Sequence, residues 1–262
     1  MKRIISLILS AVLLVGCCSM FSISVFAEVP TFTTSDACMA LLKEYEGFCK
    51  YPIWDYGQWT VGYGTRCPDD KLAEYKKNGI PVEEAEELFR SFLRAFEKEL
   101  NERVIQKNNL TLTQNQFDAL LSFSYNCGTG WTYDSTSAMY VAVVSGATGT
   151  EMIRSFALWC SAGGEVLTYL LQRRLSEANM YLNGEYNRKP PENYCYVLYN
   201  ANGGTTKPKT QGYDATAEAA PYPTPTYSGY TFDGWYTDRV GGEKVTALTA
   251  AHHGTTLYAH WV

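Results

Sequence analysis

The spacing of hydrophobic and polar positions divides the chain into three parts. An apolar run follows a short basic start, and from Thr34 to about Tyr186 the apolar residues mostly recur at helical spacing. A block with strand-like patterns then extends to the C-terminus. Residues 188–193 separate the two blocks, and their two prolines break the helical pattern, so we interpret them as a linker. The pattern therefore predicts one domain over residues 28–187 and another over residues 194–262.

Four helices are predicted in the first block. Ser35 is a candidate N-cap for the first helix, and Gly47 is a natural stop for it. The second begins at Pro81, and the third begins at Thr113, whose spacing to Gln116 is that of a capping box. The last is expected to run from about Glu165 to Leu182.

The second block predicts a small β-rich domain. Three segments combine aromatic and β-branched residues and are separated by glycine-rich turns: Tyr194–Tyr199, Tyr230–Tyr236 and Thr255–Trp261. We interpret Trp235 and Trp261 as core residues of this domain. Residues 51–65 of the first block, rich in glycine and aromatic residues, also predict short strands. The expected fold class is therefore α+β.

The N-terminus is typical of an export signal. A basic start, an apolar middle and a small-x-Ala end predict a secretory signal peptide over residues 1–27, cut after Ala27. A lipid-modified Cys17 and an uncleaved anchor are the alternatives. Apolar residues, and not a polar tether, follow Cys17, which favours the cut after Ala27. We expect a protein that is secreted or held at the surface of a bacterium.

Composition narrows the classes of function. Among 262 residues, 46% are hydrophobic and 19% are charged, as in folded globular proteins. The formal charge is −5 and becomes −7 without residues 1–27, because that segment holds two basic residues and no acidic one. Nucleic-acid-binding proteins are normally basic, so we expect no nucleic-acid partner.

Cysteine and histidine give no metal pattern. Six cysteines follow residue 27, and in an exported protein they are either paired in disulfides or free. They show no CxxC pair, and His252, His253 and His260 have no ligand partners at metal spacing. We expect neither a metal nor a cofactor, and surface positions for the three histidines.

Candidate chemistry is clearest between Glu46 and Thr65. Glu46 falls at the expected end of a helix, where the negative end of the dipole favours a protonated carboxyl. Asp55 lies in a polar, glycine-rich turn, where we expect an ionised carboxylate. One protonated and one ionised carboxyl are what glycoside hydrolysis requires. Alone, however, this pair is weak evidence, because two such carboxyls are more often a solvated helix end and a turn aspartate.

The surrounding motifs carry a resemblance to a known family. Glu46-Gly47, Asp55 and the run Thr60–Thr65 resemble the catalytic segment of phage-type lysozymes, the endolysin-like muramidases of glycoside hydrolase family 24. Four later segments of the chain resemble later segments of that family in the same order: Leu112–Leu120, Tyr125–Gly128, Trp159–Gly164 and Arg173–Glu177. The resemblance spans about residues 35–186. It implies a mainly helical domain with a small β-lobe.

The resemblance also implies roles for three residues. Glu46 matches the general acid, Asp55 the second carboxylate, and Thr60 the hydroxyl that holds the catalytic water. The family usually has one more residue between the Asp and the Thr than this chain has between Asp55 and Thr60. The substrate-binding residues stay open.

Three further residues allow two interpretations each. Arg173 and Arg174 are candidates either for a cation near Glu46 or for an ion pair with Glu177, and we favour the ion pair. Asn126 is a candidate either for binding an acetamido group or for capping the helix that ends near Gly128, and we favour the cap.

The second block resembles an internalin B-repeat-type module, also called the Listeria–Bacteroides repeat. The matching segments are Asn202–Gly204, Pro223–Thr237, Gly241–Gly242 and Leu257–Trp261. The resemblance implies a small β-grasp-like module of exported bacterial proteins. A cell-surface or wall partner for this module is expected, but its chemistry stays open.

Together these features predict an exported peptidoglycan hydrolase. The expected reaction is that of an N-acetylmuramidase, a lysozyme that cleaves the β-1,4 bond between N-acetylmuramic acid and N-acetylglucosamine. Two alternatives remain: an inactive wall- or surface-binding protein, and a lytic transglycosylase on the same fold. The presence of Asp55 disfavours the transglycosylase, which has no need of a water-activating carboxylate.

Overall fold

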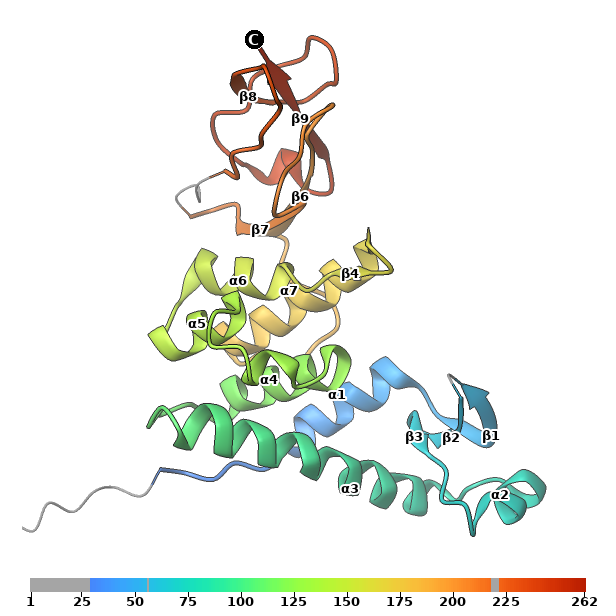
Figure 1. Ribbon diagram of the computed structural model, residues 1–262. Coiled ribbons are helices and arrows are strands. Elements are labelled where there is room, and N and C mark those ends of the chain that lie inside the picture. The colour runs from blue at the N-terminus through green and yellow to red at the C-terminus, as the bar shows by residue number, and fades with distance from the viewer. Residues whose placement is uncertain (1–28, 56, 218–221) are drawn as a thin grey trace, which may run out of the picture.

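The computed structural model describes residues 29–55, 57–217 and 222–262 (Figure 1). The signal peptide predicted for residues 1–27, with its alternative at Cys17, lies outside these residues. Within the described part of the chain, no helix is both long and apolar enough to cross a membrane.

The chain up to residue 183 is mainly helical. Its α-helices are α1 (Asp36–Glu46), α2 (Leu72–Asn78), α3 (Val82–Leu100), α4 (Gln114–Cys127), α5 (Ala138–Ser145), α6 (Gly149–Ala157) and α7 (Thr168–Asn183). A π-helical turn, Asn101–Gln106, continues α3, and a 3₁₀ turn covers Gly130–Thr132. The strands are β1 (Cys49–Asp55), β2 (Gln58–Gly62) and β3 (Thr65–Arg66), which form an antiparallel sheet, and the hairpin β4 (Ser161–Ala162) and β5 (Glu165–Val166).

The long helix α3 joins the small β-sheet to the other helices. Figure 1 shows α3 running from the β1–β3 sheet and α2 to the region where α4 packs against α7. Its fully buried apolar residues Ala85, Phe89 and Leu93 recur at helical spacing. The small β-lobe and the helical part thus share one core.

The C-terminal part is rich in strands, as predicted. It contains β6 (Tyr194–Asn200), β7 (Thr210–Asp214), β8 (Phe232–Tyr236), a 3₁₀ turn (Ala250–His252) and β9 (Thr256–Trp261). The sheet order is β7-β6-β9-β8, and β6 and β9 run parallel at its centre. Trp235 is buried in the core of this sheet as expected, whereas Trp261 packs against that core and is partly buried.

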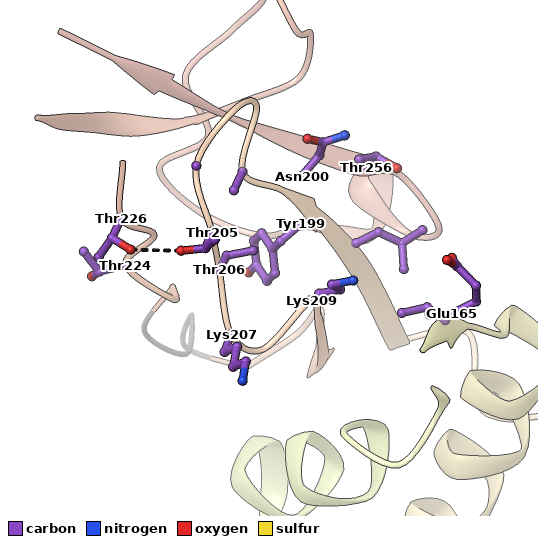
Figure 2. A pocket seen from close by; sticks show the side chains of 14 residues that line it. Glu165, Tyr199, Asn200, Thr205, Thr206, Lys207, Lys209, Thr224, Thr226 and Thr256 are labelled. Atoms are coloured by element: carbon purple, nitrogen blue, oxygen red, sulfur yellow. Dashed lines mark hydrogen bonds between the residues drawn. The ribbon is translucent and has the colours of Figure 1, made fainter. Parts of the chain in front are cut away.

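Strand β6 contributes to two cores because its side chains alternate between the two faces of the sheet. Tyr194 and Tyr196 are buried in the core of the helical part. Cys195, Val197 and Tyr199 are buried in the core of the C-terminal part. The strand-rich part is therefore packed on the helical part through β6 and β7, and Figure 2 shows one edge of this contact. The exact domain limits, and a linker at residues 188–193, stay predictions.

The last helix of the helical part begins later than predicted. We expected it to start near Glu165, but Glu165 and Val166 form β5, and α7 begins at Thr168. Gly163 and Gly164 adopt φ of +60° and +85°, which turns the chain into a hairpin before the helix starts. Helices α2, α5 and α6 and strand β7 were not predicted, because short segments carry little periodic signal.

All six cysteines of the described residues are free, which decides between the two alternatives left by the sequence. Cys38, Cys67, Cys160 and Cys195 are buried. In the same part of the chain, no group of histidine, cysteine and acidic residues is arranged to hold a metal ion.

Candidate active site

Glu46 is the last residue of α1, as the sequence predicted. Ser35 caps the start of this helix by accepting a hydrogen bond from the Cys38 N–H at 3.1 Å. Gly47 ends the helix at φ +71°, and its N–H donates to the Lys43 carbonyl at 2.9 Å. Both ends of α1 are therefore set by local backbone chemistry, which fixes where Glu46 leaves the helix.

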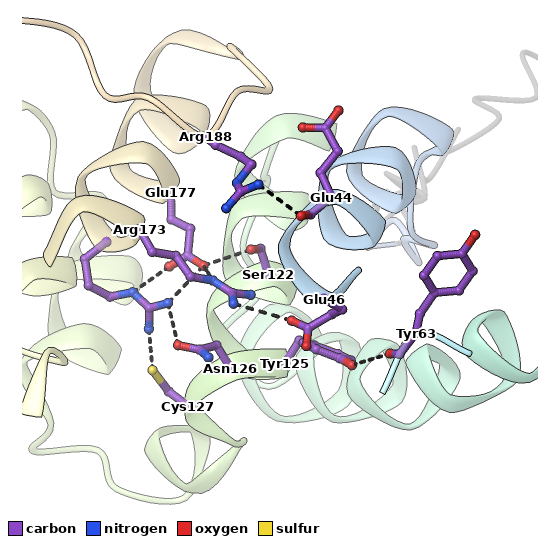
Figure 3. A network of polar contacts seen from close by, with 11 residues as sticks. Glu44, Glu46, Tyr63, Ser122, Tyr125, Asn126, Cys127, Arg173, Glu177 and Arg188 are labelled. Atoms are coloured by element: carbon purple, nitrogen blue, oxygen red, sulfur yellow. Dashed lines mark hydrogen bonds and ion pairs between the residues drawn. The ribbon is translucent and has the colours of Figure 1, made fainter. Parts of the chain in front are cut away.

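The Glu46 carboxyl is partly shielded from water and faces a cation. Its side chain is 24% exposed, and Oε1 lies 3.5 Å from Nη1 of Arg173 (Figure 3). Burial raises the pKa of Glu46 above its ordinary value, and the positive charge of Arg173 lowers it in part. The direction agrees with the protonated form expected from the sequence.

The turn after β2 passes beside this carboxyl. A Cβ atom on Gly64 would lie 3.6 Å from Glu46 Oε2 and 3.5 Å from the Tyr125 hydroxyl oxygen. That hydroxyl donates to the Tyr63 carbonyl at 3.2 Å. Burial raises the pKa of Tyr125, and the charge of Glu46 raises it further, so this side chain stays a neutral phenol.

Gly62 is required for a different reason. It adopts φ +67°, and a Cβ atom there would lie 2.9 Å from the Cβ of Ala85 on α3. The backbone of β2 therefore approaches α3 more closely than a larger residue allows. This contact holds the turn that carries Gly64 against the rest of the molecule.

A buried ion network lies behind Glu46 (Figure 3). Glu177 is fully buried and accepts hydrogen bonds from Ser122 at 2.8 Å and from Nε of Arg173 at 3.1 Å. Arg174, also fully buried, pairs with Glu177 at 2.8 Å. Both interpretations of the arginines hold: Arg174 is the structural partner of Glu177, and Arg173 bridges Glu177 and Glu46.

The favoured interpretation of Asn126 is wrong. Its Oδ1 atom accepts a hydrogen bond from Nη2 of Arg174 at 2.9 Å, so the side chain belongs to the ion network. The end of α4 is closed by the Gly128 N–H, which donates to the Ser124 carbonyl at 2.7 Å. Arg174 also donates to the thiol of Cys127.

Tyr45 lies between two guanidinium groups. The Cζ atom of Arg173 is 4.2 Å from the centre of its ring, and that of Arg188 is 5.1 Å from it. Arg188 also donates to the Glu44 carbonyl at 3.1 Å, near the C-terminal end of α1. The segment that follows α7 is thereby attached to the helix that carries Glu46. Sequence reasoning missed this, because a single arginine beside two prolines has no distinctive signal.

Asp55 and Thr60 lie on one face of the β1–β2 hairpin. Asp55 pairs with Gln58, and Ile53 pairs with Thr60, which places Asp55 and Thr60 at diagonal positions. The connection contains Gly57 at φ +90°, so the shorter spacing is accommodated within a tight turn. Asp55 is exposed, whereas Thr60 is 6% exposed and its hydroxyl donates to the Ile53 carbonyl at 3.5 Å.

The structure thus groups the predicted residues in two sets. Glu46 belongs to a set with Arg173, Tyr125 and Gly64, and Asp55 and Thr60 form the second set on the hairpin that follows α1. A partly exposed carboxyl with a raised pKa can donate a proton to a bound oxygen.

Two curated relatives are endolysins of Bacillus phages. The chain is 30% identical to the phage B103 endolysin over 181 residues, which are 67% of this chain and 59% of that protein. It is 30% identical to the phage PZA endolysin over 153 residues, which are 57% of this chain and 55% of that protein. The chain therefore spans less than two thirds of the length of either relative.

A solved endolysin structure has a fold similar to that of this chain. The endolysin from Escherichia coli O157:H7 phage FAHEc1 matches with a TM-score of 0.51 and 26% identity, over 60% of this chain and 98% of that one.

Family models match both parts of the chain. The model described as the Listeria-Bacteroides repeat domain matches residues 196–260. The model described as phage lysozyme matches residues 43–177, more than half of the chain, including Glu46, Asp55 and Thr60. With its helical lysozyme-like fold and the order of its motifs, this chain belongs to the phage lysozyme family.

Proposed function

We propose that the protein is a lysozyme, an N-acetylmuramidase that hydrolyses the β-1,4 bond between N-acetylmuramic acid and N-acetylglucosamine in peptidoglycan. The observation that carries the proposal is the Glu46 carboxyl in a chain of the phage lysozyme family. It is partly exposed, its pKa is raised by burial, and Arg173 holds it at the end of α1.

Each of the three predicted residues has a role in this proposal. Glu46 gives its proton to the glycosidic oxygen, so that the leaving sugar departs as a neutral alcohol. Asp55 supplies the negative charge that activates the attacking water or stabilises the positive charge developing on the sugar ring. Thr60 shares the face of the hairpin with Asp55, and its hydroxyl holds the water.

Export and wall attachment are part of the same proposal. The substrate lies outside the cytoplasm, which suits a signal peptide removed after Ala27. The module near residues 194–262 would attach the enzyme to a wall or surface partner. Sequencing the N-terminus of the exported protein tests the first point: a start at Glu28 supports it, whereas a lipid-modified Cys17 contradicts it.

Product identification tests the reaction. Purified protein is incubated with peptidoglycan, and the released fragments are separated and identified by mass. Fragments with reducing N-acetylmuramic acid ends are expected, whereas 1,6-anhydro ends would identify a transglycosylase.

Glu46→Gln is the matched control for the incubation with peptidoglycan. The amide keeps the shape of the side chain but cannot donate the proton, so fragment release should fall by about 10²- to 10⁴-fold with folding intact. Lysis by Glu46→Gln at the wild-type rate would show that the catalytic assignment is wrong. Absence of release by the wild type would favour a purely wall-binding protein.

A further inference from the structure

A second candidate site lies between the two parts of the chain. A cavity of about 850 Å³ is bounded on one side by Glu165 and Val166 of the β4–β5 hairpin. On the other side it is bounded by β6, by the connection from β6 to β7, and by residues near Thr224 and Thr256 (Figure 2). Its volume lies within the range of about 300–1,000 Å³ typical of ligand pockets, which often form at domain contacts. None of Glu46, Asp55 and Thr60 lines it.

The two parts of the chain that bound this cavity are joined by buried contacts outside it. Gly212 of β7 packs so closely on α6 that a Cβ atom there would lie 2.7 Å from the Cβ of Ala157. The Cys160 thiol and the Thr210 hydroxyl are 3.5 Å apart in the same buried contact. The Asn183 side chain, at the end of α7, donates to the Tyr194 hydroxyl at 3.0 Å. These contacts hold the two parts of the chain, and with them the two sides of the cavity, against each other.

Opposite charges line the cavity without neutralising each other. Figure 2 shows the Lys209 side chain extending toward Glu165, whereas Lys207 points away from it. Lys209 and Glu165 are both exposed, and neither forms an ion pair with a residue that the structure describes. Leu198 and Tyr199, which are adjacent on β6 and point to opposite faces of the sheet, also line the cavity. A ligand that carries both an anionic and a cationic group would satisfy both walls.

The cavity is connected to the candidate active site through one helix. Glu165 precedes the start of α7 by three residues, and α7 carries Arg173 in its second turn. Arg173 is five positions after Thr168, a rise of about 7.5 Å along the helix. Helix α7 therefore joins the hairpin that bounds the cavity to the residue that contacts Glu46.

We propose that this cavity binds the stem peptide of peptidoglycan. The inference rests on the proposed function, because it names the part of that substrate that the second site holds. Stem peptides carry free carboxylates and, on their diamino acid, a free amino group, which match Lys209 and Glu165 respectively. A neutral glycan has no charge for either residue, and Glu165 repels an all-anionic phosphate polymer.

The test measures binding of a free peptide by calorimetry, using the full-length protein. The probe is N-acetyl-L-Ala-γ-D-Glu-L-Lys-D-Ala, compared with one analogue whose carboxylates are amidated and with another whose lysine amine is acetylated. Each analogue is expected to bind about tenfold more weakly than the probe, because each loses one charge-assisted contact.

Two variants assign each contact to its wall. Lys209→Ala should bind the probe about tenfold more weakly and no longer distinguish it from the amidated analogue. Glu165→Gln should no longer distinguish it from the acetylated analogue. Lys77→Ala, which changes an exposed lysine on α2, is the matched control and should bind as the wild type does.

Three outcomes would overturn the inference: equal binding of the probe and both analogues, unchanged discrimination in both variants, or displacement of the probe by peptide-free glycan or by teichoic acid. Peptide binding needs no hydrolysis, so the two proposals fail separately. A protein that binds the probe as expected but releases no wall fragments would contradict only the reaction. One that releases fragments but does not bind the probe would contradict only the peptide site.

Discussion

Arg173 and Glu46 are 127 positions apart in the sequence, and their side chains meet at 3.5 Å. The same guanidinium donates from Nε to Glu177, which Arg174 also contacts. The buried carboxylate of Glu177 therefore holds Arg173 in position, and the guanidinium group of Arg173 lies beside the Glu46 carboxyl. The pKa of Glu46 is the outcome of burial, which raises it, and of this cation, which lowers it.

Replacing Arg173 should shift the pH dependence of activity. If Glu46 is the general acid, activity falls as the pH rises through its pKa, because only the protonated form can donate. Arg173→Gln removes the cation that lowers this pKa, so the alkaline limb of kcat/KM should move to higher pH. Arg173→Lys keeps the charge and should move the limb less. A pH profile on soluble muropeptides measures both shifts. An unchanged alkaline limb in Arg173→Gln would mean that the acid titrating on that limb is not Glu46.

Glu46 should also make folding stability depend on pH. Its folded pKa is raised, so the native state binds a proton more tightly than the unfolded chain does. Stability is therefore lost as the pH rises through the unfolded and then the folded pKa. Glu46→Gln cannot ionise at this position and does not lose this stability. Its free energy of unfolding, relative to that of the wild type, should therefore be higher at pH 7 than at pH 3. Urea unfolding at both pH values measures the difference, and a stability of Glu46→Gln relative to wild type that falls between pH 3 and pH 7 would contradict the sign.

Asp55 and Thr60 should act as a unit if both position one water. Asp55→Asn should lower kcat/KM by about 10²-fold or more, because it removes a charge needed in the transition state. Thr60→Ala removes one hydroxyl and should cost about 1–3 kcal/mol of transition-state stabilisation. The double variant should lose less than the sum of the two. Thermal unfolding is the control, because Thr60 is buried.

Additive losses in that cycle would indicate that Thr60 and Asp55 act separately and that the shorter hairpin has moved Thr60 off the water. Wild-type activity in Thr60→Ala would exclude Thr60 from the reaction, and the proposed function would then rest on Glu46 and Asp55.

Gly212→Ala should weaken the contact between the two parts of the chain. The added Cβ would lie 2.7 Å from Ala157 Cβ and 3.1 Å from the Ile153 carbonyl oxygen, so α6 and β7 must separate slightly. We expect a loss of about 1–3 kcal/mol in the free energy of unfolding, measured in urea. Gly130→Ala is the control, because a Cβ atom there meets nothing within 4 Å. Equal stability of the two variants would mean that this contact is not tight in solution.

Local signals in the sequence were sufficient where a structure depends on neighbouring residues. Ser35 and Gly47 act on backbone groups within one helical turn, so the bounds of α1, and with them the position of Glu46, could be predicted. The same holds for Thr113 and Gln116, whose side chains and backbones form the predicted capping box at the start of α4. The change from helical to strand-like periodicity likewise indicated the two parts of the chain.

Only the tertiary structure decided which distant residues meet. The pairing of Arg173 with Glu46, the contact of Asn126 with Arg174, and the free state of the cysteines all depend on how helices pack, which no local pattern encodes. Strand β6 shows the reason most directly. Its alternation could be read as one buried and one solvated face, yet Tyr194 and Cys195 are both buried, in two different cores. Whether a face is covered is decided by what packs on it, and here α7 contacts β6 while α6 contacts the neighbouring strand β7.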